Sequence, residues 1–486
     1  MSEEITALEP RAVWRYFAEL SAIPRPSQRE ERAAAFAEAF GRRHGLKASR
    51  DAVGNVILRK PATPGMENRL PIVLQGHLDM VCQKNADTDF DFENQGIELY
   101  LDGDWVKARG TTLGADNGIG VSAILAVLAS DDIPHPPIEA LFTVNEESGM
   151  TGALGLQPGQ LSGAMLLNLD TEDDRELTIG CAGAVNVTAT GHYSQAPCVQ
   201  GDAAFRLTVK GLRGGHSGMD IHRGRGNANR LLARLLLAAE PLGLHVATVD
   251  SGGLRNAIPR EGTALVTVDE RRADALRDRL EAESAALRTE FAETDPELEI
   301  LLVPAERPES VLEAAFQAKW LRAVHACPGG IFRMSPSVPG LVQTSNNLAR
   351  VWAADGRYEM LCLTRGAVDS EKMDLAASIR GLFELLGAEV ALSGAYPGWA
   401  PQPDSDLVRL MAALYEERFG ERPQVLACHA GLECGIIGHR YPGMQMVSFG
   451  PNIRGAHSPD ERVQVSSVQK FWAYLLEALQ RIPACA

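Results

Sequence analysis

Short apolar runs alternate with helical stretches at both ends of the chain, and this alternation predicts an α/β fold. Buried strands are predicted at residues 55–59, 72–75, 138–144 and 165–169, and a strongly apolar helix is predicted at residues 119–128. Because short strands and helices follow one another, we expect a mostly parallel mixed sheet flanked by helices.

The pattern changes between residues 185 and 395, where alternating, half-exposed strands surround charged helices. A strand–helix–strand order occurs twice there, which predicts an inserted α+β domain with two lobes. Residues 1–184 and 396–486 then form one discontinuous domain. The elements predicted in the insertion are strands at 204–210, 263–269, 298–303, 357–364 and 389–393 and helices at 227–239, 273–293 and 370–386.

Two helices are predicted before the first strand. The first has an apolar face and ends before Pro24. Ser27 and Glu30 have the spacing of a capping box, so we expect Ser27 to cap an alanine-rich helix that ends near Gly45.

The composition is that of an ordinary globular protein, with 45% apolar and 23% charged residues among 486. The net charge of −16 has no basic stripe to offset it, which argues against a nucleic-acid partner. The eight cysteines are scattered and match no common zinc motif. Since the N-terminus lacks a signal-peptide pattern and no apolar run is long enough to cross a membrane, we expect a cytoplasmic protein with no membrane partner.

Acidic and histidine-bearing loops follow several apolar segments, and most of them begin where a predicted strand ends. In open α/β sheets, ligands bind in the crevice beyond the carboxyl ends of the strands. Two histidines and several carboxylates, delivered from distant segments, are what a two-metal hydrolytic centre requires. The candidate residues in these loops are His77, Asp79, Asp116, Glu146, Glu147, Asp170 and His457.

Each loop taken alone also has an ordinary structural explanation. His77 and Asp79 suit a metal ligand and the carboxylate that orients it, or a polar surface turn. Asp116 lies among small residues and suits a carboxylate that bridges two ions, or an Asx turn before a helix. The metal centre is therefore indicated by the combination of these loops and not by any one of them.

Glu146 and Glu147 are adjacent acids at the end of a buried strand, where two unpaired charges are costly to hold. A metal ion would neutralise one of them and the other would be a general base for water, although adjacent acids are usually just solvated. Asp170 follows a similar apolar run. His457 precedes a Ser-Pro-Asp-Glu segment that ends at Glu461, whose acids can orient the imidazole.

Jointly and in this order, the loops resemble those of the co-catalytic dizinc peptidase family that includes carnosinases, aminoacylases and peptidase T. The resemblance covers essentially the whole chain. It includes the segments KARGTTLGADNG at 107–118, GGHSG at 214–218, NAIPRE at 256–261 and HAGLECG at 429–435.

The resemblance implies two divalent metal ions per chain. His77 and Asp170 would bind one ion, and Glu147 and His457 the other. Asp116 would bridge them. A set of histidines and carboxylates suits zinc, with manganese or cobalt as alternatives, better than calcium or magnesium.

The resemblance also implies three residues that act in the reaction without binding metal. Glu146 would be the general base, and Asp79 would orient a metal-binding histidine. His216, in the inserted domain, would contact the substrate or the developing oxyanion, although a lone histidine is more often a surface residue. The inserted domain would then be a lid that closes over the substrate.

Three further residues are candidates for binding the substrate. Asn256 and Arg365 suit its carboxylate or carbonyl, and a structural salt bridge is an equal alternative for Arg365. Glu433 suits the free amino group of a substrate, with a structural role as the alternative.

The function that the resemblance implies is metal-dependent hydrolysis of dipeptides with a free N-terminus, of the Xaa-His type and including β-Ala-His. Other dipeptides, tripeptides or N-acyl amino acids are alternative substrates for the same centre. A non-catalytic metal- or peptide-binding protein is the alternative from another class, and it is disfavoured because Glu146 accompanies the ligands. We also expect homodimerisation through the lid, unless a duplicated lid replaces the partner subunit.

Overall fold

The computed structural model describes residues 3–485. The chain forms two compact units. The first consists of Met1–Gly180, Pro401–Ala427 and Leu432–Ala486, and the second of Cys181–Ala400 and Cys428–Gly431. The chain therefore leaves the first unit for one long insertion and, near its end, for a second insertion of four residues.

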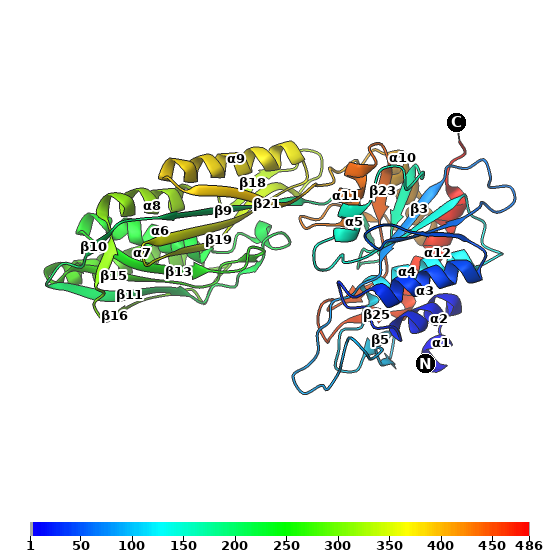
Figure 1. Cartoon of the computed structure of the whole chain (residues 1–486), viewed down its shortest axis with the longest axis horizontal. Coiled ribbons are helices and arrows are strands. Elements are labelled where there is room, and N and C mark those ends of the chain that lie inside the picture. Colours follow the sequence, from blue (N-terminus) through cyan, green and yellow to red (C-terminus); the bar gives the residue numbers. More distant parts are fainter. Residues whose placement is uncertain (1–2, 486) are drawn as a thin grey trace. The chain divides into compact units, whose positions relative to one another are not determined.

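The sheet of the first unit, in which Figure 1 labels β3 and β23, has eight strands in the order β1-β2-β6-β3-β7-β23-β8-β22. The central strands β6, β3, β7 and β23 run parallel, whereas β1, β2 and β8 introduce antiparallel pairs. The predicted mixed, mostly parallel sheet is therefore confirmed. Its strands are Lys47–Arg50 (β1), Val56–Lys60 (β2), Ile72–His77 (β3), Ile138–Thr143 (β6), Met165–Asn168 (β7), Glu176–Thr178 (β8), Gln424–Leu426 (β22) and Gln445–Ser448 (β23).

Helices cover this sheet, and α4 is the most deeply enclosed of them. It packs against α2 and against β3, and nearly all of its residues are buried. That burial explains why its sequence is apolar on every side rather than amphipathic. The helices of this unit are Glu3–Thr6 (α1), Arg11–Ser21 (α2), Glu31–Arg43 (α3), Ala115–Ala129 (α4), Thr151–Gly155 (α5), Asp406–Phe419 (α10), Glu433–Arg440 (α11) and Val465–Arg481 (α12).

The predicted cap of α3 is wrong. The residue that precedes α3 is Glu30, and it makes no capping hydrogen bond with its side chain. Ser27 instead donates its hydroxyl to Asp79 Oδ2 at 2.7 Å. Because α3 begins at Glu31, Ser27 lies too far before the helix to accept its first N–H groups, and its hydroxyl donates instead to the buried carboxylate of Asp79.

The second unit is built on one continuous antiparallel sheet in the order β16-β11-β15-β13-β19-β20-β9-β21, with β18 paired to β19. Helices α7, α6, α8 and α9 contact one another in that order and cover the sheet (Figure 1). The strands that the sequence assigns to two lobes thus share one sheet, and the division into lobes stays a prediction. The elements are Gly183–His192 (β9), Asp202–Lys210 (β11), Ala228–Ala239 (α6), His245–Gly252 (β13), Gly262–Asp269 (β15), Ala273–Glu290 (α7), Glu299–Pro304 (β16), Ala314–Ala326 (α8), Gly330–Met334 (β18), Val342–Ala354 (β19), Arg357–Gly366 (β20), Asp369–Leu386 (α9) and Glu389–Tyr396 (β21).

Smaller sheets complete the chain. In the first unit, β24 and β25 form a hairpin that pairs through β25 with β5, β5 pairs in turn with β4, and the loop of the hairpin carries His457. In the second unit, β12 pairs with β14, and β10 with β17. These strands are Leu99–Asp102 (β4), Trp105–Ala108 (β5), Gln195–Pro197 (β10), Gly215–His216 (β12), Ala257–Ile258 (β14), Ser310–Leu312 (β17), Ile453–Arg454 (β24) and Arg462–Gln464 (β25).

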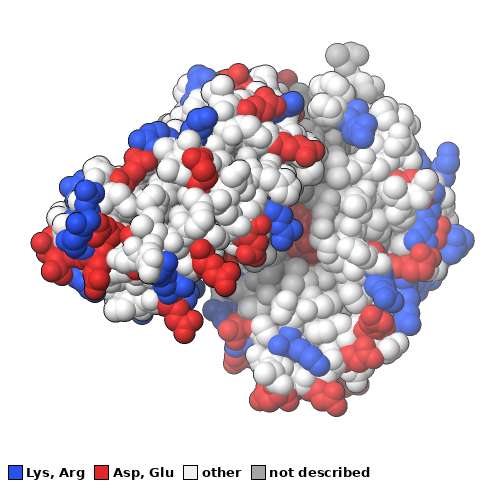
Figure 2. Space-filling view, turned by 60° about the vertical axis from the view of Figure 1, so that its left-hand side comes forward, with Lys and Arg blue, Asp and Glu red and all other residues white. Residues whose placement is uncertain are grey.

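The surface is charged and mixed. On the face shown in Figure 2, Lys and Arg side chains are interspersed with Asp and Glu. Among the described residues, no helix combines the length and the apolar character that a membrane span needs.

Candidate metal centre

All five predicted metal ligands lie together in the first unit. His77 is the last residue of β3, Glu147 follows β6, and Asp170 follows β7. These three strands are parallel neighbours, so their carboxyl ends meet at one edge of the sheet. Asp116 comes from the start of α4 and His457 from the β24–β25 hairpin.

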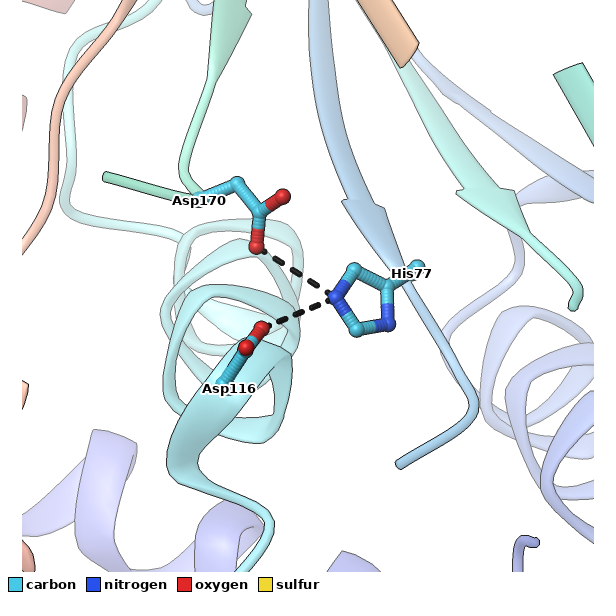
Figure 3. A group of neighbouring side chains, drawn as sticks. All are labelled: His77, Asp116 and Asp170. Atoms are coloured by element: carbon cyan, nitrogen blue, oxygen red, sulfur yellow. Dashed lines mark hydrogen bonds and ion pairs between the residues drawn. The ribbon is translucent and has the colours of Figure 1, made fainter. Parts of the chain in front are cut away.

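The side chains form two groups that share Asp116. In the first group, Nε2 of His77 lies 3.0 Å from Asp116 Oδ1 and 3.4 Å from Asp170 Oδ1 (Figure 3). In the second, Nε2 of His457 lies 3.2 Å from Asp116 Oδ2 and 3.1 Å from Glu147 Oε2. The two oxygens of one carboxylate therefore face two different histidines.

The donor atoms fit a divalent ion in each group. In both groups the candidate ligand atoms lie within 4.8 Å of one another. Glu147 Oε1 is buried and accepts no hydrogen bond from the described residues, and the buried Asp170 Oδ1 has the 3.4 Å contact with His77 but no hydrogen bond among them. A buried carboxylate oxygen without a donor is costly, and a cation would compensate it. Glu146 lies close enough to His77 and Glu147 to complete a third group of this kind.

The negative charge of the cluster favours bound cations, and the carboxylates raise the pKa values of the two histidines. Burial alone would lower the pKa of His77, but the carboxylates of Asp170 and Asp116 raise it well above its usual value. Hydrogen bonds with Asp116 and Glu147 raise the pKa of His457 to about 11. Without a metal ion, protonated imidazoles thus balance part of the negative charge.

Glu146 has the environment of a proton acceptor. Burial, together with the nearby carboxylates of Asp170 and Glu433, raises its pKa well above the usual value, against the opposing effect of His77. A carboxylate with raised proton affinity is better matched to base catalysis near neutral pH than an ordinary solvated one.

Asp79 ties the loop after β6 to the histidine after β3. Its carboxylate accepts the backbone N–H groups of Glu146 and Glu147 at 3.0 and 3.1 Å. Its Oδ1 lies 3.4 Å from His77 Nδ1. Burial would raise the pKa of Asp79, but its hydrogen bonds with His77, Ser27 and Glu146 lower the pKa to about 2. The carboxylate is therefore ionised, bonded to the backbone of Glu146 and Glu147 and facing the ring of His77.

Sequence reasoning missed a row of buried polar side chains beneath the ligands. Gln75 donates to Glu433 Oε2 at 2.7 Å and accepts from Asn168 at 2.5 Å. Ser448 in turn donates to Asn168. These residues lie on the adjacent strands β3, β7 and β23, with Glu433 at the end of the row. The signal was present in the sequence as single polar residues inside otherwise apolar strands.

Glu433 is more enclosed than a substrate-binding residue on a surface. It is 1% exposed, and Oε2 also accepts the hydroxyl of Thr143 at 2.6 Å. Its Oε1 has no hydrogen-bond partner among the described residues. Burial is the main cause that raises its pKa, to about 7.

Glu172 is a second residue that sequence reasoning missed. It lies two residues after Asp170, and burial together with the carboxylates of Asp116 and Asp170 raises its pKa to about 8. The signal in the sequence was its closeness to Asp170. Glu461 also differs from the expectation that it orients His457, because its carboxylate accepts backbone N–H groups of residues 113–116.

The candidate residues of the second unit form a separate group. His216 Nδ1 accepts the backbone N–H of Met219 at 3.0 Å, so in the neutral ring the proton is on Nε2. Burial and the charge of Arg365 lower the pKa of His216. Nη2 of Arg365 lies 3.4 Å from His216 Nε2, and two donors that close together suit an acceptor between them. Asn256 adjoins them through its backbone carbonyl, which accepts from Ser217 at 2.7 Å.

Comparison with known proteins gives one consistent family. The model of peptidase family M20/M25/M40 matches residues 73–481. The chain is 44% identical to the cytosol non-specific dipeptidase of Escherichia coli (strain K12) over 482 residues, 99% of each chain. The structure of aminoacylhistidine dipeptidase from Vibrio alginolyticus superimposes with a TM-score of 0.94 at 43% identity, covering 100% of this chain and 99% of that one.

The fold recurs in more distant structures. Aminopeptidase PepT from Bacillus cereus superimposes with a TM-score of 0.57 at 15% identity, and the alignment covers 98% of this chain and 99% of that one. At this level of identity the similarity establishes the fold alone.

Proposed function

The chain belongs to peptidase family M20/M25/M40, and from that premise we propose that it is a dipeptidase with two divalent metal ions, preferably zinc. The observation that carries the proposal is the position of Asp116, whose oxygens lie 3.0 and 3.2 Å from Nε2 of His77 and His457. A carboxylate shared in this way suits a bridge between two ions.

His77 and Asp170 would hold one ion, and Glu147 and His457 the other. Ions bound there would supply Lewis-acid polarisation of the scissile carbonyl and of the attacking water. Asp79 orients His77 and fixes the backbone of Glu147 through its carboxylate. The protein's own contribution is therefore to hold five donors in place before substrate arrives.

Glu146 is the proposed general base. Its carboxylate takes a proton from the attacking water and later donates it to the departing amine nitrogen, so that the side chain is regenerated. The raised pKa of Glu146 supports this role because a base with higher proton affinity pulls more strongly on the proton of water. Its backbone N–H, bound to Asp79 Oδ1 at 3.0 Å, fixes the loop that carries it.

Residues of the second unit are proposed to bind the substrate. Arg365 is the candidate for a carboxylate, because a guanidinium offers parallel donors. His216, with its proton on Nε2, is the proposed donor to the developing oxyanion. Asn256 is a further candidate for the carbonyl or carboxylate. If His216 donates to the oxyanion, the inserted unit must close over the substrate, and closure is therefore part of the proposal.

Glu433 is proposed to recognise the free amino group of the substrate. Its unpartnered, buried Oε1 supports this role, since an ammonium group would supply the missing donor. Xaa-His dipeptides, β-Ala-His among them, are the proposed preferred substrates. The name of the relative from Vibrio alginolyticus supports that preference, and the name of the Escherichia coli relative supports a broader range of dipeptides and a cytosolic location.

A substrate panel tests the proposal. The zinc-loaded protein is compared on β-Ala-His, Gly-His, Leu-Gly, a tripeptide and an N-acetyl amino acid. We expect hydrolysis of the dipeptides and little of the last two. Preferential cleavage of the N-acetyl compound would instead assign an amidohydrolase, and binding without turnover of any compound would assign a non-catalytic protein. Sedimentation of the same sample tests the proposed homodimer.

A further inference from the structure

Glu461 is a buried carboxylate that has no part in the chemistry proposed above. It is 2% exposed and lies in the β24–β25 hairpin, four residues after His457. Its Oε2 accepts backbone N–H groups at 2.7 and 2.8 Å and its Oε1 accepts two more at 2.8 and 3.2 Å. The four donors are the N–H groups of Leu113, Gly114, Ala115 and Asp116.

The opposite side of the same turn is held by a buried cation. Arg25, 1% exposed, donates to the carbonyl oxygens of Leu78 and Asp79 at 3.0 and 2.9 Å and of Gly114 at 2.5 Å. Only glycine fits at position 114, because its φ is +70° and a Cβ would lie 2.5 Å from Arg25 Nη2. The turn before Asp116 is therefore fixed through both its N–H groups and a carbonyl group.

Burial of these two charged groups costs free energy unless all of their hydrogen bonds are formed. A carboxylate in a buried site needs donors for its lone pairs, and four N–H groups of the turn that precedes the helical part of α4 supply them. Glu461 and Arg25 carry opposite charges on the two sides of one turn. Movement of either residue would leave a buried charged group without its hydrogen bonds to the backbone.

We infer that Glu461 is a positioning residue of the metal centre: it fixes Asp116 relative to His457 before any ion binds. Asp116 Oδ2 and His457 Nε2 lie 3.2 Å apart, and Glu461 connects their two loops through its bonds to residues 113–116. A site whose ligands are already in place loses less entropy on binding an ion. The inference rests on the proposed metal centre.

A purely structural role for Glu461 makes a different prediction. Its loss would then destabilise the protein without selectively weakening metal binding. Glu139 offers a matched control, because it is also a buried glutamate that accepts two backbone N–H groups, at 2.6 and 2.9 Å, and pairs with Arg59 at 3.0 Å. It lies near the start of β6, whereas Glu146 and Glu147 follow the end of that strand.

The test compares Glu461→Gln, Glu461→Asp and Glu139→Gln in the full-length protein. In Glu461→Gln an NH2 group faces two N–H donors, so the turn must shift. Zinc affinity of the metal-free proteins is measured by competition with a chromogenic chelator, and cobalt absorption spectra report the ligand geometry. Thermal unfolding of the metal-free proteins measures the structural cost of each change.

We expect zinc to bind about 10- to 100-fold more weakly to Glu461→Gln, with an altered cobalt spectrum, as when groups that orient ligands are lost. Glu461→Asp should be intermediate, and Glu139→Gln should bind like the wild type. Wild-type affinity in both Glu461 variants would overturn the inference, and if Glu461→Gln does not fold, Glu461→Asp decides alone. If the wild type itself bound no zinc, the proposed function would fail first.

Discussion

At the scale of single residues, the site is a set of ordinary side chains whose roles come from their neighbours. Asp116 is useful because each of its oxygens faces a different histidine. Glu146 differs from Glu147, its neighbour in sequence, because the pKa of Glu146 is raised by burial and by surrounding carboxylates, whereas Glu147 Oε2 lies 3.1 Å from His457. The pair of adjacent acids thus divides into a proposed base and a proposed ligand.

The general-base assignment predicts the behaviour of Glu146→Gln. The amide cannot accept the proton of water, so kcat should fall by about 100- to 10,000-fold while the protein keeps its zinc. Steady-state hydrolysis of Gly-His and metal analysis of the same sample check both parts. Glu139→Gln changes a buried carboxyl in β6, the strand that precedes Glu146, and should keep its turnover. Near-normal kcat in a zinc-loaded Glu146→Gln protein would remove Glu146 from the mechanism.

The orienting role proposed for Asp79 predicts that its substitution weakens metal binding rather than proton transfer. Asp79→Asn removes the charge that orients His77 and fixes the loop of Glu146 and Glu147, so zinc affinity should fall about 10- to 100-fold. Ser27→Ala removes only the 2.7 Å hydrogen bond to Asp79 and should weaken zinc binding much less. Chelator competition measures both affinities. Equal affinities in the two variants would contradict the proposed role of Asp79.

Binding of metal ions to the candidate centre should release protons from it. In the metal-free protein the pKa of His457 is about 11, so the imidazole is charged at pH 8, and a metal ion can bind only the neutral ring. Addition of zinc in weak buffer at pH 8 should therefore release protons, which an indicator dye measures. His457→Gln should release fewer. Zinc uptake without any proton release would contradict this description of the cluster.

The same raised pKa has a consequence for the stability of the metal-free protein. A folded pKa above the unfolded value of 6.5 means that the charged imidazole of His457 stabilises the fold fully below pH 6.5. That contribution is lost as the pH rises through about 11. Binding of a metal ion replaces the proton and removes this dependence.

At the scale of elements, the strand ends were the predictable part of the site. Apolar periodicity located β3, β6 and β7, and a parallel arrangement of strands implies that their carboxyl ends meet. The packing of polar groups was less predictable. Ser27 looked like a helix cap because its spacing to Glu30 is local, whereas its true partner, Asp79, is distant in sequence. The hydrogen bonds of Glu461 were not predicted for the same reason, since its partners at 113–116 are more than three hundred residues away.

The polar row beneath the ligands predicts a cost in stability. Asn168→Leu leaves Gln75 Oε1 and the hydroxyl of Ser448 with one partner fewer inside the sheet, which should lower the free energy of unfolding by about 1–3 kcal/mol for each unsatisfied group. Thr178→Val, which removes a single 3.3 Å contact with Thr171, should cost less. Urea unfolding of the metal-free proteins measures both. An unchanged stability of Asn168→Leu would show that the row is not held by these bonds.

At the scale of the whole molecule, the chain assembles the site from both of its ends. His457 joins residues of the first 170 positions because Pro401–Ala427 and Leu432–Ala486 belong to the same compact unit as Met1–Gly180. The sequence indicates an insertion because His457 lies far along the chain from the other candidate ligands. The short insertion at Cys428–Gly431 had no such signal, because its assignment to the second unit depends on contacts between segments distant in sequence.

The most direct test of a two-metal dipeptidase is a titration of the metal-free protein with zinc while the hydrolysis of Gly-His is followed. We predict no turnover without metal and a rate that reaches its plateau only when two zinc ions are bound per chain. Full activity in the metal-free protein, or a plateau at one ion with no second ion bound, would contradict the account.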